Sequence, residues 1–456
     1  MSAEQTAPAA RWQGPSTVSS DGITSSELRR AAWAASLGSA LEYYDFALYN
    51  LCSALVFGPL FFPSSDPILG LIGSFGTYFL GFAARPLGGI LFGIAGDRLG
   101  RKFVLTATIL LMGSASTLMG VLPTYATAGI WAPIALVALR LLQGLGAGAE
   151  QAGAAVLMAE YAPPARRGYF AALPFIGVQL GSAMAVLIYF LLLNRDGDIG
   201  HSYAWRIPFL LSAFIIGVAV WIRLRLKESP SFAKLEKRKE IDPRPLANLL
   251  RHSRRPLLLV IGLRFAEGSG SAIYQTLAIS YIVTVTGQSG SIGALSLLLG
   301  AASGAIMVLL AGILSDRFGR VTMYRIYAVA QLLLAVPIWW ALHLGDKIIS
   351  IAAIVIALLP LWGMFGTQAA LLPELFGARH RYVGVATGRE FSAMIAGGTA
   401  PLIGAAIIAQ MARHGDAAGA WAPIALYLVA MTLITIVATF FTPETRGRPL
   451  DDLRDA

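Results

Sequence analysis

Long runs of apolar residues, separated by short polar segments, dominate the pattern of this chain. We count twelve such runs, and a helix needs about 20 mostly apolar residues to cross the hydrocarbon core of a bilayer. Because a backbone in lipid must satisfy its own hydrogen bonds, the runs are predicted to be helices. Their expected limits are 31–57, 68–95, 103–122, 132–162, 168–193, 205–226, 257–285, 291–315, 323–342, 348–375, 382–412 and 421–442.

Composition agrees with this interpretation, since 56% of the 456 residues are hydrophobic and 13% are charged. Soluble domains carry about 25% charged residues. The single cysteine, Cys52, lies in an apolar run, so it cannot form an intrachain disulfide or build a metal cluster by itself. The first thirty residues are polar and lack the apolar core of a cleavable signal peptide, so we expect a cytoplasmic tail.

Basic side chains gather in alternate connections between the runs. The net charge is +10, yet one set of connections holds only Arg195, Lys347 and Arg413. Basic residues concentrate on the cytoplasmic side of membrane proteins. The asymmetry therefore predicts cytoplasmic termini and an even number of spans. It also explains the basic charge without nucleic-acid binding, which we do not expect.

Two motifs recur at nearly one spacing. Gly93–Lys102 follows the second span, Gly312–Arg320 follows the eighth, and Asp316 lies 219 residues after Asp97. Glu160 and Glu374 open a second pair of related motifs after spans four and ten. We predict a duplicated six-helix unit with parallel repeats, which places a substrate site between the halves. The expected divisions are a tail (1–30), an N-terminal half (31–226), a linker (227–256), a C-terminal half (257–442) and a second tail (443–456).

The repeated motif resembles the loop motif of the major facilitator superfamily. Its glycines allow a tight turn and its aspartate can lie at a helix N-terminus and pair with arginine. We interpret these residues as a conformational latch rather than as substrate contacts. The latch residues are Asp97, Arg98, Arg101, Asp316, Arg317 and Arg320.

Further motifs resemble the metabolite:proton symporter family within that superfamily. They are Glu42–Phe46, Arg85–Gly89, Arg140–Glu150, Trp205–Phe209, Glu228–Phe232 and Pro443–Gly447. The resemblance covers nearly the whole chain and implies an all-α fold of twelve helices around a central cavity. It also implies import, with protons, of dicarboxylates, tricarboxylates, 2-oxoacids, shikimate-like acids, or proline and betaine. Osmosensing members carry a long C-terminal coiled coil, and the residues after Pro443 lack heptads, which disfavours that type.

Ionisable groups inside spans are costly, so they are expected to face a cavity and to pair. Glu42, Asp45 and Tyr49 share one face of span one, and Arg140 lies well inside span four. The resemblance to proton-coupled carriers favours Asp45 and Arg140 as the coupling pair, in which protonation of Asp45 releases Arg140. The alternative is a permanent structural ion pair. Glu42 and Glu267 are further candidates for proton coupling.

Span seven carries a polar and aromatic stripe of Arg264, Glu267, Ser271, Tyr274 and Tyr281. We predict that it lines the central cavity. The planar guanidinium of Arg264 can bind a carboxylate through two parallel hydrogen bonds, which a lysine cannot do as well. The alternative is that Arg264 pairs only with Glu267, one turn away.

Other polar side chains inside spans are candidate substrate contacts, although buried amides often serve only as interhelical hydrogen bonds. These candidates are Tyr44, Arg85, Gln179, Gln275, Trp362 and Gln368. Another set is assigned to gating, for Arg389 a turn or two inside span eleven, or to holding cytoplasmic helix ends together, for the three glutamates. That set is Glu150, Glu160, Glu374 and Arg389. The glycines of 144–148 permit close helix packing and are no nucleotide site, because no strand precedes them.

The sequence therefore predicts a multi-pass transporter of the inner membrane that imports a small organic acid with a proton by alternating access. The second hypothesis is a carrier of a zwitterionic osmolyte, with Tyr44, Tyr274 and Tyr281 as an aromatic cage. A sensor that does not transport and an efflux pump for apolar cations are further alternatives. No nucleophile elbow, P-loop or metal motif suggests an enzyme. We expect a monomer in the lipid bilayer with the proton as coupling ion and no other cofactor.

Overall fold

The computed structural model describes residues 25–63, 67–99, 101–148, 150–196, 203–225, 245–377, 381–450, 452 and 454–456. Within these ranges the chain forms helices and no strand. Nine helical stretches of the described chain are long and apolar enough to cross a membrane, and shorter apolar helices lie at Thr106–Met119 and Tyr203–Val218. Each predicted span corresponds to one helix or to two or three consecutive helical segments, so the predicted all-α fold with twelve spans is confirmed.

Six spans come from the N-terminal part of the chain. They are α1 (Ser25–Leu55), α3 (Pro67–Leu99), α4 (Arg101–Met119), α6 (Trp131–Ala147) followed by α7 (Glu150–Tyr161), α8 (Arg167–Asp196) and α9 (Arg206–Arg225). Short elements connect them, namely α2 (Phe57–Phe61), α5 (Tyr125–Ala128), η1 (Pro164–Arg166) and η3 (Tyr203–Trp205).

Six more spans follow. They are α12 (Arg254–Ala272) with η4 (Ile273–Leu277) and α13 (Ala278–Thr284), α14 (Gly290–Phe318), α15 (Arg320–His343), α16 (Lys347–Leu375), α17 (Arg381–Ser392) with η5 (Ala393–Gly398) and α18 (Thr399–Arg413), and α19 (Trp421–Phe441). Helix α11 (Pro245–His252) precedes them and η6 (Ala417–Ala420) precedes α19. The segments η4 and η5 are π-helical, and such segments often occur at functional sites.

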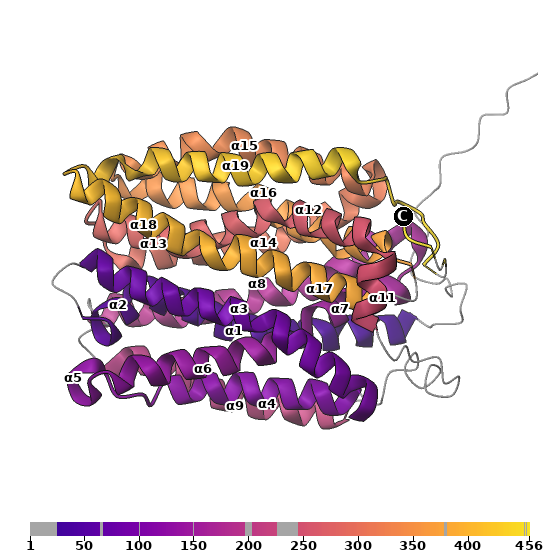
Figure 1. Ribbon diagram of the computed structural model, residues 1–456, viewed down its shortest axis with the longest axis horizontal. Coiled ribbons are helices and arrows are strands. Elements are labelled where there is room, and N and C mark those ends of the chain that lie inside the picture. The colour runs from indigo at the N-terminus through magenta and orange to yellow at the C-terminus, as the bar shows by residue number, and fades with distance from the viewer. Residues whose placement is uncertain are drawn as a thin grey trace, which may run out of the picture.

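The two groups of helices lie side by side with their axes roughly along the length of the molecule (Figure 1). The indigo and magenta helices occupy the lower part of the view and the orange and yellow helices the upper part. Helices α8 and α14, α3 and α18, and α1 and η4 pack against each other across the boundary. The exact limits assigned above to halves, linker and tails stay predictions, and residues 1–24 and 226–244 lie outside the described residues.

Glycines allow the closest approaches between helices. A side chain at Gly144 of α6 would collide with the carbonyl of Gly81 on α3, and one at Gly181 of α8 would collide with the carbonyl of Ala40 on α1. Small residues let backbones approach in this way in membranes, where apolar burial does not drive helices together. The predicted role of Gly144 in close packing therefore agrees with the structure.

We call the end of the bundle that holds Glu374 and residues 443–450 the tail end, and the end that holds α2 and α5 the far end (Figure 1). Large apolar side chains such as Trp33, Phe214, Leu333 and Phe440 are exposed on the outside of the helices between these ends. In lipid such side chains are in contact with hydrocarbon, so their exposure fits a membrane-embedded protein.

Candidate functional site

An ion pair joins the two groups of helices inside the bundle. Arg85 of α3 places Nε 2.6 Å from Oε2 of Glu390 on α17, and its Nη2 lies 3.3 Å from Oε1. The same Nη2 lies 3.8 Å from Oε1 of Glu42 on α1. All three side chains are buried. Removing one member of a buried ion pair costs about 3–5 kcal/mol, because the other charge is left buried without a partner. Loss of either Arg85 or Glu390 should therefore disfavour this arrangement.

Arg264 of α12 is held by one residue of its own helix and by residues of two other helices, α16 and α17. Its Nη2 lies 3.1 Å from Oε2 of Glu267, its Nε donates to Oγ of Ser392 at 2.9 Å, and its Nη1 donates to Oε1 of Gln368 at 2.9 Å. Arg264 therefore does not pair with Glu267 alone, since α16 and α17 also orient it. Gln368 accepts this bond and does not itself line a cavity of the described chain.

These charged groups surround a small cavity of about 80 Å³ between the two groups of helices. Its charged lining residues are Arg85, Arg264, Glu267, Arg389 and Glu390. Its aromatic lining residues are Tyr43, Phe46, Tyr78 and Phe82. Uncharged polar lining comes from Asn50, Ser182, Ser271 and Gln275. We call this space the charged cavity.

A second space of about 10 Å³ adjoins the charged cavity and shares Ala47, Asn50, Ser182 and Gln275 with it. We call it the amide slot. Its remaining lining residues are Gln179, Val186, Leu297, Ala301, Leu358 and Trp362. The predicted candidates Gln179, Gln275 and Trp362 thus lie together, on α8, η4 and α16.

Asp45 and Arg140 lie near each other but, among the described residues, they do not form a direct ion pair. Oδ1 of Asp45 accepts from Oγ of Ser212 on α9 at 2.6 Å. Arg140 donates to Gln143, and its guanidinium carbon lies 3.7 Å from the centre of the Tyr49 ring. The expectation of a direct pair is therefore wrong, because the ring of Tyr49 and the amide of Gln143 hold the guanidinium. A role of either residue in coupling stays a prediction.

Three predicted tyrosines point away from both cavities. Tyr44 donates to the carbonyl of Pro208, Tyr274 stacks on Trp339 at 6.3 Å, and Tyr281 donates to the carbonyl of Ala418. The aromatic cage proposed from Tyr44, Tyr274 and Tyr281 is therefore wrong. Instead Tyr43, one residue before Tyr44, lines the charged cavity.

The angle between residues around the helix axis explains why Tyr274 was wrongly predicted to line the cavity. At about 100° per residue, Gln275 falls about 20° from Arg264 around the axis, whereas Tyr274 falls about 80° away. The π-helical segment Ile273–Leu277 coincides with this change of face. The sequence analysis also did not predict that Asn50 and Ser182 line the charged cavity. Tyr43, Ala47 and Asn50 follow the spacing of one helical face, and this spacing could have indicated Tyr43 and Asn50.

The tail end of the bundle is closed by a second set of buried charges centred on Glu374. Its Oε1 lies 2.9 Å from Nη1 of Arg167 on α8, and its Oε2 lies 3.2 Å from Nε of Arg320 on α15. Asp316 accepts from the backbone N–H groups of Gly168 and Tyr169 at 2.8 and 2.9 Å, and also pairs with Arg320. The contacts of Glu374 with Arg167 and of Asp316 with Gly168 and Tyr169 cross between the two groups of helices, which is what a latch requires.

Other predicted latch residues differ in their surroundings. Glu160 pairs with Arg381 across the boundary at 3.1 Å, whereas Arg317 is exposed. Arg389 lines the charged cavity, so it lies deeper than a latch at the helix ends. The side chains of Asp97, Arg98, Arg101 and Glu150 lie outside the described residues.

The residues after α19 run across the same end of the bundle. Glu444 accepts from the backbone N–H groups of Arg320 and Val321 at 2.8 and 3.1 Å, at the start of α15. Thr445 donates to Oε2 of Glu374 at 2.7 Å, and Arg167 donates to the carbonyl of Arg448 at 2.9 Å. The predicted C-terminal tail is thus part of the closed tail end.

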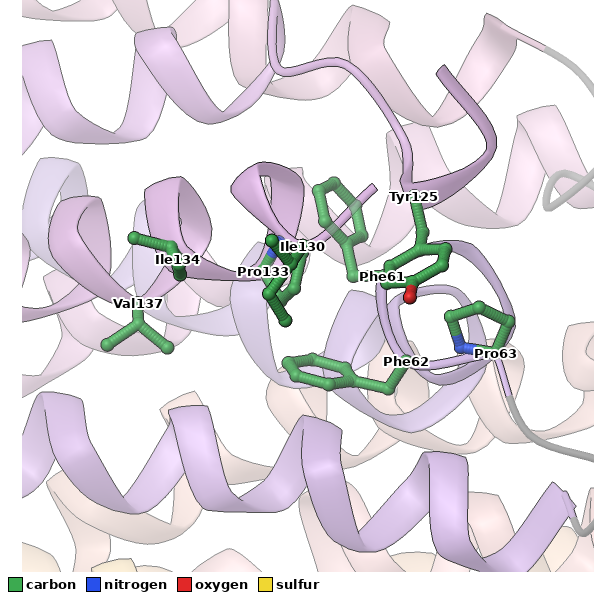
Figure 2. Close-up of a pocket in the computed structure, with 8 residues that line it drawn as sticks. All are labelled: Phe61, Phe62, Pro63, Tyr125, Ile130, Pro133, Ile134 and Val137. Atoms are coloured by element: carbon green, nitrogen blue, oxygen red, sulfur yellow. The ribbon is translucent and has the colours of Figure 1, made fainter. Parts of the chain in front are cut away.

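A larger hollow of about 340 Å³ lies elsewhere, at the far end of the bundle (Figure 2). It is lined by Phe61, Phe62, Pro63, Tyr125, Ile130, Pro133, Ile134 and Val137. This lining comes from the N-terminal group of helices alone and contains no charged side chain. The volume of a cavity therefore does not identify the functional site in this protein. The charged lining and the central position of the smaller cavities identify it instead.

Known transporters are similar to this chain over nearly its whole length. The Shikimate transporter of Escherichia coli (strain K12) is 33% identical over 434 residues, 93% of this chain and 96% of that protein. The Proline/betaine transporter of Salmonella typhimurium is 32% identical over 451 residues, 96% of this chain and 87% of that protein. The proton:xylose symporter XylE, bound to 6-bromo-6-deoxy-D-glucose, has the same fold, with a TM-score of 0.71 at 17% identity over 94% of this chain and 98% of that chain.

The family model described as Major Facilitator Superfamily matches residues 35–398, which include the charged cavity, the amide slot and the latch around Glu374. Members of this family and the relatives above are transporters and not enzymes. The chain belongs to the major facilitator superfamily.

Proposed function

We propose that the protein imports a small organic acid together with a proton by alternating access, in the inner membrane and with both termini in the cytoplasm. The observation that carries this proposal is the charged cavity between the two groups of helices. Three arginines, Arg85, Arg264 and Arg389, face it against the two carboxylates of Glu267 and Glu390. Glu42, 3.8 Å from Arg85, adds a third buried carboxylate, so the cluster is balanced in charge. Its guanidinium groups offer a carboxylate ligand charged hydrogen-bond donors in a space from which water is largely excluded.

Alternating access requires contacts at both ends that can break in turn. At the tail end the contacts are the ion pairs of Glu374 and Glu160 described above. Toward the far end, Oγ of Ser280 on α13 donates to the carbonyl of Ala54 on α1 at 3.0 Å. The charged contacts at the tail end and the weaker polar contact at the far end support a state in which the central cavity is closed at both ends. Either end can then open when its contacts break.

Proton coupling is supported by carboxylates buried in the membrane-spanning region. Glu42 is fully buried, and Asp45 and Glu267 are nearly so. Ionisable groups inside membrane spans often serve in proton relays, so these three carboxylates are the candidates for binding and releasing the proton. We assign the main coupling role to Asp45, because its carboxylate accepts from the neutral hydroxyl of Ser212 rather than from a cation.

The osmolyte hypothesis loses its aromatic cage in this arrangement. The rings of Phe46 and Phe82 do face the charged cavity, but the guanidinium carbon of Arg85 lies 5.0 and 5.4 Å from their centres. A quaternary ammonium would have to displace this arginine from the ring faces. An organic acid competes instead with Glu390 and Glu267 for the guanidinium groups of Arg85 and Arg264.

Uptake into proteoliposomes tests the proposal. An imposed proton gradient, acid outside, is expected to drive accumulation of a labelled organic acid, and a protonophore should remove it. Uptake of each tested acid that ignores the gradient would contradict symport. Accumulation of glycine betaine, unaffected by carboxylic acids, would favour the osmolyte hypothesis instead.

The Arg264→Ala variant is expected to lower the affinity for the transported acid about 10- to 100-fold. A hydrogen bond to a charged group contributes about 1.5–3 kcal/mol, and the alanine removes both the charge and the donors. Arg264→Lys keeps the charge without the planar donors, so its affinity should be intermediate. Binding to purified protein, measured by calorimetry, checks both.

Arg325→Ala provides the matched control. Arg325 donates to Oγ1 and to the carbonyl of Thr439 at 3.0 Å each, between α15 and α19 and away from both cavities. Its loss should leave the affinity for the acid unchanged. If Arg264→Ala also binds the acid with unaltered affinity, Arg264 is not part of the substrate site.

A further inference from the structure

The amide slot contains buried polar atoms without hydrogen-bond partners. Both polar atoms of the Gln179 amide, Nε1 of Trp362 and Oδ1 of Asn50 have none within the described chain. Gln179 is 1% exposed and Trp362 is 5% exposed. Buried polar groups in folded proteins are almost always paired, and those that are not call for an explanation. A ligand that supplies the missing donors and acceptors is such an explanation.

Two of these atoms, Nε1 of Trp362 and Oε1 of Gln179, lie close to one position beside Gly304. A side chain at Gly304 of α14 would meet Nε1 of Trp362 and Oε1 of Gln179, each at 2.8 Å. Gly304 therefore leaves room beside a donor from α16 and an acceptor from α8. Gln275, whose Nε2 donates to Oγ of Ser271 at 2.5 Å, lines the same slot from η4.

The slot and the charged cavity differ in electrostatic character although they adjoin. None of the residues that line the slot is charged, whereas the charged cavity has three arginines and two glutamates. A carboxylate bound in the charged cavity can face Arg264 or Arg389. A carboxylate bound in the slot would lose its water without gaining a cation, which is strongly unfavourable.

We propose that the substrate spans both spaces, with one carboxylate in the charged cavity and hydroxyl or carbonyl groups in the amide slot. The protein would then select hydroxylated monocarboxylates over dicarboxylates, tricarboxylates and unsubstituted acids. This inference rests on the proposed function, since it takes the anionic end of the substrate from it. The slot supplies both donors, at Trp362 and Gln179, and acceptors, at Gln179 and Asn50, which suits a hydroxyl group.

Specificity is the measurable consequence. A site built to hydrogen-bond a hydroxyl rejects the analogue without it by a large factor, because the polar groups of the site are left unpaired. We expect the full-length protein in nanodiscs to bind shikimate at least about 100-fold more tightly than cyclohex-1-ene-1-carboxylate, which has the same ring and carboxylate without hydroxyls. Succinate and citrate should bind more weakly than shikimate. Calorimetry of each compound gives the affinities.

Two variants separate the slot from the rest of the site. Gln179→Leu and Trp362→Phe remove the polar atoms but keep much of the side-chain volume. Each is expected to weaken shikimate binding about 10- to 100-fold while changing the affinity for the unsubstituted acid by less than about threefold. Gln331→Leu is the control, because Gln331 is a buried glutamine that donates to the carbonyl of Ala266 at 3.0 Å, outside both cavities. It should leave the ratio of the two affinities unchanged.

Equal affinities for the hydroxylated and unsubstituted acids, or tighter binding of succinate or citrate, would overturn this inference. If such an acid is still accumulated with protons, the proposed function stands while the inference fails. If no acid binds and glycine betaine does, both fail. If a Gln179→Leu variant keeps its full preference for shikimate over the unsubstituted acid, the amide slot does not contribute to substrate recognition.

Discussion

The Asp45→Asn variant is expected to lose proton-driven accumulation while it still exchanges substrate across the membrane. Asp45 is 3% exposed, and its Oδ1 accepts from Ser212 at 2.6 Å. Asparagine has nearly the same shape and its carbonyl oxygen can accept the same hydrogen bond, so the local packing should persist. It cannot bind and release a proton. The variant should therefore still move substrate across the membrane, but the proton gradient should no longer drive its accumulation.

The measurement compares two assays on one proteoliposome preparation. With one proton per substrate, a gradient of one pH unit corresponds to about 1.4 kcal/mol and to about tenfold accumulation. The wild-type protein should approach this accumulation and Asp45→Asn should show none. Counterflow, in which internal unlabelled substrate drives entry of labelled substrate, should remain within a few-fold of wild type. The two assays together distinguish lost coupling from lost binding.

Asp346→Asn is the matched control for this substitution. Asp346 lies before α16, where Oδ1 accepts from the backbone N–H of Ile349 at 2.9 Å, and asparagine caps helices equally well. Its accumulation should equal that of wild type. Normal accumulation by Asp45→Asn would move the coupling role to Glu42 or Glu267, which the same pair of assays would then test.

The arrangement of the spans could be predicted from the sequence because it depends on local properties. A bilayer requires an apolar helix of minimum length, and both requirements are visible in a single stretch of chain. The repeated motifs at Asp97 and Asp316 added the duplication. The spans 291–315 and 348–375, for example, correspond to α14 and α16.

The direction in which an individual side chain points was harder to predict, because it depends on the rotation of each helix about its own axis. Tyr44 was chosen where Tyr43 lines the cavity, a difference of one residue and about 100° around the helix. The π-helical segment Ile273–Leu277 also lacks a clear sequence signal. Residues near the start of a stripe, Arg264 and Glu267, were placed correctly, whereas Tyr281 at its end was not.

Partners that are distant in the sequence were the least predictable. Arg85 and Glu390 come from α3 and α17, and no property of either segment specifies the other. Arg140 illustrates the same limit, since an opposite charge lies near it and yet Tyr49 and Gln143 hold it. Charge alone predicts that a buried arginine has partners but does not identify them.

The Glu374→Gln variant is expected to shift the protein toward a state that is open at the tail end. Glu374 is fully buried and holds two arginines, Arg167 of α8 and Arg320 of α15. Glutamine leaves both guanidinium groups without this counter-charge while the tail end is closed. Breaking a buried pair in this way costs about 3–5 kcal/mol. When the tail end opens, Arg167 can reach water, so most of that cost falls on the closed state. The closed-to-open ratio should therefore drop by about 100-fold or more.

Thiol labelling measures this shift. Ser182 lines both cavities, so Ser182→Cys, in a chain in which Cys52 is replaced by Ser, reports access from either side. A membrane-impermeant reagent applied from the tail-end side should label this cysteine faster in Glu374→Gln than in the parent. The matched control is Glu444→Gln, because Glu444 caps the start of α15, and its bonds to Arg320 and Val321 stay within the C-terminal group of helices. Labelling should not change in that control. Unaltered labelling of Glu374→Gln would show that the ion pairs at the tail end do not set which state the transporter occupies, because the loss of a buried charge would then be compensated without opening.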